Sequence, residues 1–267
     1  MSLHFYPLTI KQIIKETSDC VSIEFIIPEH LRYIFAYKQG QYITIKTIIE
    51  GVEVRRSYSL CSSPLDNEFK IAIKKVEGGL FSSFANDVLK AGDVLETMPP
   101  MGKFFTALNP TNKKEYVGFA AGSGITPMLS IINTTLQTEP NSSFTLIYGN
   151  KNSTSIIFKD QLEALKNKHL SRFQLIHILS REKTDADINY GRIDHFKCNR
   201  LFENLLNINS DEFFICGPEE MIFSVKDFLE NRLVEEQKIH FELFTSANSH
   251  TSKSNNQVAI DNSPKSK

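Results

Sequence analysis

Residues 56–59, Arg-Ser-Tyr-Ser, combine groups that could bind a flat, negatively charged cofactor. If they lie on a strand, alternation places Arg56 and Tyr58 on one face. The tyrosine ring could stack on the isoalloxazine of a flavin and the guanidinium could pair with its phosphate, while Ser59 at the strand end could hydrogen-bond the flavin N5 edge. Taken alone, the four residues are also typical of ordinary cross-strand packing.

Two glycine-containing turns are candidates for binding phosphate. Residues 77–86 pass from a strand through Gly79 into a helical pattern. There Ser82 or Ser83 could be the N-cap and the first-turn amides could bind a pyrophosphate, although a plain capped turn is the alternative.

Residues 122–127, Gly-Ser-Gly-Ile-Thr-Pro, follow an apolar strand and open a helix with proline in its first turn. This is typical of a dinucleotide site, although G-x-G-x-x-P departs from the usual fingerprint and the missing Gly-Lys-Ser/Thr excludes a P-loop.

Ser180 and Arg181 end a later predicted strand, at the sheet edge where the second glycine turn is expected. A hydroxyl and a guanidinium there could hold a ribose 2′-phosphate, which favours NADP(H), whereas an acidic residue would favour NAD(H). Glu182 is adjacent, so a solvated Ser-Arg-Glu turn is the alternative. Cys216 closes another apolar strand before a Gly-Pro pair, and a lone cysteine in such a place is usually a small core residue.

The periodicity of the apolar residues changes near residue 110. Before it, β-branched stretches alternate apolar and polar residues at 21–27, 42–48 and 69–76, which predicts an antiparallel barrel or sandwich. After it, apolar strands alternate with helical segments, which predicts βαβ units and a parallel sheet. The expected strands are 116–120, 144–149, 173–180 and 212–216, and the expected helices are 127–138, 156–167 and 218–231.

This change of period divides the chain into domains. We predict an antiparallel β-barrel domain at 1–110 and a parallel-sheet α/β domain at 111–247, because the connection at 108–114 is polar and contains proline. Residues 248–267 are rich in Ser, Asn and Lys, so we expect a disordered linker or tail.

Composition excludes several classes of function. The chain has 267 residues, of which 41% are hydrophobic, and a formal net charge of −1, which favours neither nucleic acid nor an anionic membrane surface as a partner. The N-terminus has no signal-peptide pattern and no stretch approaches the length of a membrane span, so we expect a cytoplasmic protein. The four cysteines lack metal-binding spacing, so no metal site is expected.

Taken together and in order, these motifs resemble those of the ferredoxin–NADP⁺ reductase superfamily, and most closely those of the reductase components of multicomponent oxygenases. The resemblance extends from about residue 3 to residue 247 and includes R-x-Y-S, G-x-x-S, G-x-G-x-T-P, C-G-P and a terminal E-x-F strand. It implies that the barrel residues and the terminal strand bind FAD through Arg56, Tyr58, Ser59, Leu60, Ile73, Lys75, Gly79, Leu80, Ser82, Ser83, Glu242 and Phe244. It implies NADP(H) binding by Gly122, Gly124, Thr126, Pro127, Lys151, Ser180, Arg181, Cys216, Gly217 and Pro218.

The resemblance also implies a reaction. Hydride passes from NADPH to FAD, and single electrons then pass to an iron–sulfur or flavodoxin acceptor. Ser59, Thr126 and Cys216 would border the reacting atoms. Members of this subgroup usually continue into a [2Fe–2S] ferredoxin domain, so the expected partner is such a domain or a separate ferredoxin or flavodoxin, in the service of an oxygenase. The alternatives are a stand-alone ferredoxin, flavodoxin or flavin reductase, and a non-catalytic electron-transfer subunit.

Overall fold

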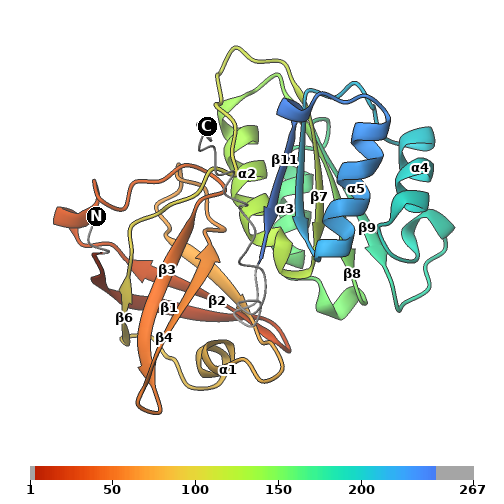
Figure 1. Cartoon of the computed structure of the whole chain (residues 1–267). Coiled ribbons are helices and arrows are strands. Elements are labelled where there is room, and N and C mark those ends of the chain that lie inside the picture. The colour runs from red at the N-terminus through yellow and green to blue at the C-terminus, as the bar shows by residue number, and fades with distance from the viewer. Residues whose placement is uncertain (1–3, 245–267) are drawn as a thin grey trace, which may run out of the picture.

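The computed structural model describes residues 4–244 and contains two sheets, one in each half of the chain (Figure 1). The first sheet has six strands in the order β4-β3-β6-β1-β2-β5, and all its pairs are antiparallel. An isolated antiparallel bridge between Leu60 and Ile71 joins the two edge strands, so the sheet closes into the predicted barrel. The strands are β1 Tyr6–Thr17, β2 Cys20–Ile26, β3 Tyr42–Ile49, β4 Val52–Ser59, β5 Lys70–Lys74 and β6 Val94–Thr97.

The second sheet is entirely parallel, as predicted, with the order β11-β10-β7-β8-β9. Helices α2 and α3 pack on one face, and α4 and α5 pack on the other. The strands are β7 Glu115–Ala121, β8 Ser143–Asn150, β9 Phe173–Leu179, β10 Glu212–Gly217 and β11 Ile239–Leu243. The helices are α2 Ile125–Thr138, α3 Lys159–Lys168, α4 His195–Asn204 and α5 Glu219–Asn231, and α1 Leu80–Asp87 belongs to the barrel.

Some boundaries differ from those expected. Helix α3 begins at Lys159 rather than at residue 156, because Phe158 has a left-handed backbone with φ of 60° and the residues before it do not continue a helix. Helix α4 was not predicted. The domain boundary after residue 110 stays a prediction, and the expected tail at 248–267 lies outside the described residues. Among residues 4–244, no helix is both long enough and apolar enough to cross a membrane.

A buried polar seam joins the barrel to the parallel sheet. From helix α2, Ser130 Oγ donates to the carbonyl oxygen of Ser62 at 2.6 Å, and Thr134 Oγ1 donates to Ser63 Oγ at 2.9 Å. All four residues are buried. A buried polar group that loses its hydrogen-bond partner costs more free energy than a displaced apolar contact. This seam therefore favours one relative position of the two sheets.

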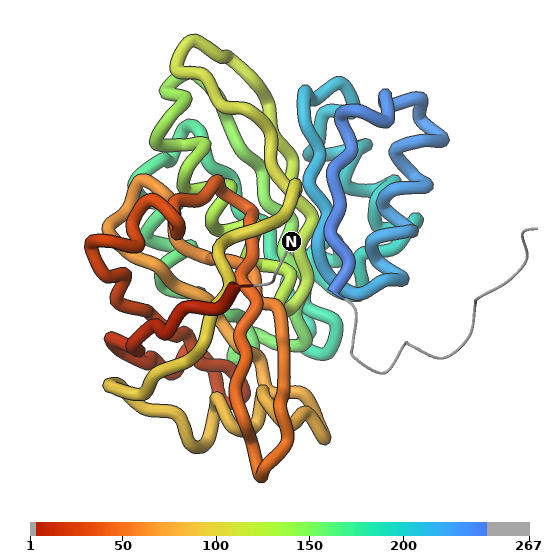
Figure 2. Tube along the Cα trace, turned by 60° about the vertical axis from the view of Figure 1, so that its left-hand side comes forward, coloured from red at the N-terminus to blue at the C-terminus, as the bar shows by residue number. Residues whose placement is uncertain are grey.

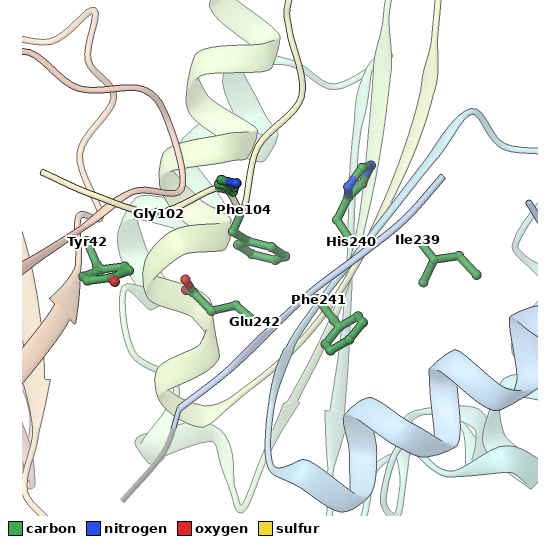
Figure 3. A pocket seen from close by; sticks show the side chains of 8 residues that line it. Tyr42, Gly102, Phe104, Ile239, His240, Phe241 and Glu242 are labelled. Atoms are coloured by element: carbon green, nitrogen blue, oxygen red, sulfur yellow. The ribbon is translucent and has the colours of Figure 1, made fainter. Parts of the chain in front are cut away.

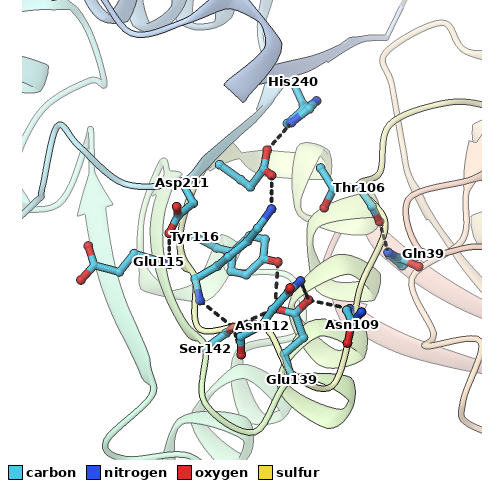
Figure 4. A network of polar contacts seen from close by, with 12 residues as sticks. Gln39, Thr106, Asn109, Asn112, Glu115, Tyr116, Glu139, Ser142, Asp211 and His240 are labelled. Atoms are coloured by element: carbon cyan, nitrogen blue, oxygen red, sulfur yellow. Dashed lines mark hydrogen bonds and ion pairs between the residues drawn. The ribbon is translucent and has the colours of Figure 1, made fainter.

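The segment between β6 and β7 runs from the barrel to the parallel sheet (Figure 2), and the carboxylate of Glu139 anchors it (Figure 4). Glu139 lies at the end of α2 and is fully buried. Its Oε1 accepts from the Asn109 backbone N–H at 3.0 Å and from Asn112 Nδ2 at 2.6 Å. Its Oε2 accepts from the Tyr116 hydroxyl at 2.9 Å and from Ser142 Oγ at 2.7 Å. Four hydrogen bonds therefore satisfy one buried carboxylate.

Replacing Glu139 by alanine should lower the free energy of unfolding by about 3 kcal/mol, because four donors lose their acceptor at once and two of them, on Tyr116 and Ser142, are buried. Glu139→Gln keeps one oxygen acceptor and should cost about half as much. Urea unfolding of the flavin-loaded protein measures both values. The control is Glu203→Ala, which removes an exposed glutamate from α4. A loss below about 1 kcal/mol for Glu139→Ala would show that the network is not stabilising.

Candidate functional site

Strands β7 and β10 are neighbours, but the chain leaves them toward opposite sides of the sheet, β8 following on one side and β11 on the other. Such a topological switch point creates a crevice at the carboxyl ends of the strands, where open α/β sheets bind ligands. The turn Gly122–Gly124 follows β7 and the Cys-Gly-Pro motif spans the end of β10, so both motifs lie at this crevice. A Cβ atom on Gly124 would lie only 2.0 Å from the carbonyl oxygen of Cys216, so glycine alone allows the two turns to approach this closely.

Hydroxyl groups hold the glycine turn in shape. The Tyr148 hydroxyl donates to the carbonyl oxygen of Gly122, and Thr126 Oγ1 donates to that of Ser123, both at 3.0 Å. Gly122 has φ of +54°, and no heavy atom lies within 4 Å of the place of a Cβ there. Pro127 lies in the first turn of α2, as predicted. An open turn at the N-terminus of a 14-residue helix fits a pyrophosphate.

At the next strand ends, the structure brings Lys151, Ser180 and Arg181 together. The backbone N–H of Ser180 donates to the Asn150 carbonyl at 2.9 Å, and that of Arg181 donates to the Lys151 carbonyl at 2.8 Å. No carboxylate within residues 4–244 forms an ion pair with either cation. The two cations fit an anionic group on a nucleotide.

Glu182, the acidic residue next to the predicted 2′-phosphate site, binds a different segment of the chain through its carboxylate. Its carboxylate accepts from the backbone N–H of Ser153 at 2.8 Å and from Ser153 Oγ at 3.0 Å. These two hydrogen bonds lower the pKa of the Glu182 carboxyl. The acidic side chain is therefore occupied at the short helix Ser153–Ser155.

The barrel provides the groups expected of a flavin site. Tyr58 packs beside Phe81 of α1, with ring centroids 5.5 Å apart. The hydrogen bond formed by the Arg56 guanidinium within residues 4–244 goes to the carbonyl oxygen of Arg55, which leaves its other N–H groups for a ligand. The first three amides of α1 find no acceptor among the described residues. A cation, free amides and an aromatic ring together fit FAD.

The first turn of α1 corrects one prediction. Neither Ser82 nor Ser83 is the N-cap, because the helix begins at Leu80 and Gly79 takes the capping position. Ser82 Oγ instead donates to the Gly79 carbonyl at 3.2 Å and accepts from the Val76 N–H at 3.1 Å. A Cβ on Gly79 would lie 2.4 Å from Ser82 Oγ, so a larger residue there would displace the Ser82 hydroxyl from this turn.

The other predicted flavin residues differ in exposure. The side chains of Leu60 and Ile73 are fully buried in the barrel core, so only their backbone could contact a flavin. Lys75 pairs with Asp87 of α1. Phe244 is exposed next to β11. Contact of these residues with FAD stays a prediction.

Ser59 and Glu242 connect the two sheets beside Cys216. Ser59 Oγ, at the end of β4, donates to Glu242 Oε2 of β11 at 3.2 Å, although 183 positions separate the two residues. Burial raises the pKa of Glu242 to about 7, although the Ser59 hydrogen bond acts in the opposite direction. Burial also raises the pKa of the fully buried Cys216 thiol, which therefore keeps its proton.

A cavity of about 340 Å³ lies beside Glu242 (Figure 3). Tyr42 and Phe104 come from the barrel side, and residues 239–242 of β11 line the opposite wall. The Glu242 carboxylate lies between Tyr42 and the strand it belongs to. The sequence did not predict this cavity or the seam through Ser130, because both depend on side chains brought together from distant segments.

Comparison with known proteins agrees with this geometry. Residues 7–106 match the oxidoreductase FAD-binding domain family, and residues 119–227 match the oxidoreductase NAD-binding domain family. The chain is 42% identical over 253 residues to one subunit of the 1,2-phenylacetyl-CoA epoxidase of Escherichia coli, covering 94% of this chain and 71% of that protein. This chain belongs to the FAD- and NAD-binding oxidoreductase family.

Two further members of the family are informative. The ferredoxin reductase component of the 3-ketosteroid-9-alpha-monooxygenase of Rhodococcus rhodochrous is 32% identical over 90% of this chain, which spans 65% of that protein. The FAD/NAD-binding domain of the nitric oxide dioxygenase of Vibrio cholerae superposes with a TM-score of 0.75 at 25% identity, covering 89% of this chain and 98% of that one. The chain is therefore an FAD-dependent oxidoreductase that uses a nicotinamide dinucleotide, which confirms the cofactor classes expected from its motifs.

Proposed function

We propose that this oxidoreductase accepts hydride from NADPH on FAD and delivers single electrons to a [2Fe–2S] ferredoxin domain or protein that serves an oxygenase. The observation that carries the proposal is the meeting of Ser59, Glu242 and Cys216 at the switch point, where the flavin half and the nucleotide half of the chain converge. A cytoplasmic location remains part of the proposal.

The residues on the barrel side hold FAD. Arg56 and the first amides of α1 bind its phosphates, and Tyr58 offers a ring for stacking on the isoalloxazine. On the other side, the Gly122–Gly124 turn binds the dinucleotide pyrophosphate. Bound FAD supplies the chemistry, because it takes two electrons as hydride and releases them one at a time. The protein contributes orientation and electrostatics, and it needs no nucleophile.

Ser59 and Glu242 form a route for a proton. Release of electrons requires a proton to leave the flavin edge, and we place Ser59 Oγ at that edge. Its hydroxyl can accept the proton and donate its own to Glu242 Oε2. With its pKa raised to about 7, Glu242 can both accept and release a proton near neutral pH. The adjacent cavity connects this carboxyl to solvent.

Arg181→Ala should raise the KM for NADPH by at least about ten-fold and leave the KM for NADH within about two-fold, because only NADPH carries the 2′-phosphate. Steady-state kinetics with both nucleotides measures the difference. The control is Lys168→Ala, which removes an exposed cation at the far end of α3. Equal changes for the two nucleotides would assign Arg181 to a site other than the 2′-phosphate site.

The visible spectrum of the purified protein tests the proposed function. Flavin bands that bleach when NADPH is added without oxygen, and that return when oxidised [2Fe–2S] ferredoxin is added, would support it. A yellow protein that NADPH does not bleach would instead indicate a non-catalytic electron-transfer subunit. A protein that is bleached but reduces only free flavin would indicate a flavin reductase.

A further inference from the structure

Lys197 is a buried ammonium that the reaction described above does not use. It lies in the first turn of α4, and only 5% of the residue is exposed. A buried lysine costs free energy unless its charge is compensated. Its neighbours on the buried face of the helix, Cys198 and Leu201, belong to the apolar core. Core packing alone would favour an apolar side chain at this position.

Three backbone carbonyls compensate this charge, and all belong to one short segment. Lys197 Nζ donates to the carbonyl oxygens of Asp187 at 3.1 Å, Ile188 at 2.8 Å and Tyr190 at 2.7 Å. An ammonium has three N–H donors, so its capacity is filled. The segment 187–191 thus directs three of its carbonyl groups toward Lys197 of α4.

The same segment lies against the end of β9, next to Arg181. Tyr190 forms a parallel bridge with Leu179, and the backbone N–H of Gly191 donates to the Leu179 carbonyl at 3.0 Å. Asn189 Nδ2 donates to the carbonyl of His177 at 2.7 Å. Leu179 directly precedes Ser180, so the segment extends the sheet at the point where the 2′-phosphate site is proposed.

We propose that Lys197 is a positioning residue for the nucleotide site. By holding residues 187–191 against β9, its ammonium fixes the wall beside Ser180 and Arg181 at which the 2′-phosphorylated adenosine of NADPH binds. This inference rests on the proposed function, because it assumes that these two residues bind the 2′-phosphate. Without the ammonium, three carbonyls lose their donors, and the segment is held against β9 only by its own contacts with Leu179 and His177.

The test uses 2′-AMP, which carries the 2′-phosphate but no nicotinamide. Titration calorimetry on the flavin-loaded protein should show that Lys197→Met weakens 2′-AMP binding by about ten-fold. The KM for NADPH should rise by a similar factor, while kcat and the flavin spectrum stay within about two-fold of the wild type. The control is Lys226→Met, which removes a lysine paired with Glu230 on α5 and should leave all values unchanged.

Unchanged binding of 2′-AMP to Lys197→Met, or equal losses in kcat and in affinity, would overturn the inference. If the wild type binds 2′-AMP and the variant does not fold, hydrogen exchange on the wild type decides. The amides of residues 187–191 should exchange more slowly with 2′-AMP bound, and no change there would refute the role. The wild type could instead bind no 2′-AMP, and NADH and NADPH could reduce its flavin at equal rates. This result would refute the NADPH assignment and the inference that rests on it, but it would leave the reductase function intact.

Discussion

Gly124→Ala should slow the reduction of the bound flavin by NADPH by about 100-fold, because a displacement of about 1 Å at a reaction site can cost that much. The added Cβ would lie 2.0 Å from the carbonyl oxygen of Cys216 and 2.8 Å from the backbone nitrogen of Gly217. Both are backbone atoms, so no side-chain rotation relieves the overlap. The two turns of the crevice must therefore move apart, and with them the pyrophosphate site and the Cys-Gly-Pro motif. Stopped-flow absorbance measures the rate.

Gly118→Ala is the matched control. Its Cβ would overlap with Met128 Sδ at 2.8 Å and with a ring carbon of Phe144 at 2.9 Å, under the same helix α2. Both are ends of side chains that can shift, and Gly118 lies within β7 rather than at the crevice. Both variants should lose about 1 to 3 kcal/mol of stability through overpacking. Only Gly124→Ala should lose the fast reduction, and equal rates in the two variants would remove the crevice from the explanation.

The periodicity of the sequence indicates the class of each sheet, because each class reflects local alternation, but it marks only the barrel strands near 21–27, 42–48 and 69–76 and leaves β1 and β6 unpredicted. Strands with one buried face have period two, whereas β7 and β10 are continuous apolar runs after their first residue. The glycine turn and the Cys-Gly-Pro motif could also be placed, since the carboxyl ends of parallel strands meet at one edge. The sequence therefore predicts the class of each sheet and the place of these two motifs.

Helix α4 was missed because its pattern is inverted. Phe196, which a helical pattern assigns to the core, is 68% exposed, whereas the adjacent Lys197 is buried. The reason lies in the three carbonyls of residues 187–190, a tertiary contact that periodicity does not encode. The seam between Ser130 and Ser62 was likewise absent from the prediction, since 68 positions separate the two residues. Polar partners distant in sequence leave no local signal.

The Ser59–Glu242 pair lies between these cases. The resemblance identified both residues, but their hydrogen bond depends on how β4 and β11 approach each other across the two sheets. Burial of the carboxyl, which determines its chemistry, is also a property of that approach. Sequence motifs therefore named the chemical groups, and the packing of one sheet on the other determined what these groups can do.

Glu242→Gln should slow the transfer of electrons from the reduced protein to ferricyanide by about 100-fold at pH 8, because an amide cannot accept the proton that Ser59 passes on. In the wild type, the rate should rise with pH through about 7, where Glu242 loses its proton and becomes a base. The variant should show no such rise. The control Glu236→Gln, at an exposed position just before β11, should retain the profile of the wild type.

The free energy of unfolding of the wild type should fall as the pH rises, whereas the rate of electron transfer rises. The pKa of Glu242 is raised above its ordinary value of 4.5 to about 7 in the folded protein, so the folded state binds a proton more tightly than the unfolded state. The contribution of this group to stability is fully present below about pH 4.5 and falls, by up to about 3 kcal/mol, as the pH rises through 7. Glu242→Gln removes that loss and should be the more stable protein at pH 8 in urea unfolding. If Glu242→Gln is both slower and less stable at pH 8, Glu242 is not a buried base. If it is slower but more stable, the carboxylate lowers the stability of the protein and is present because proton transfer needs it.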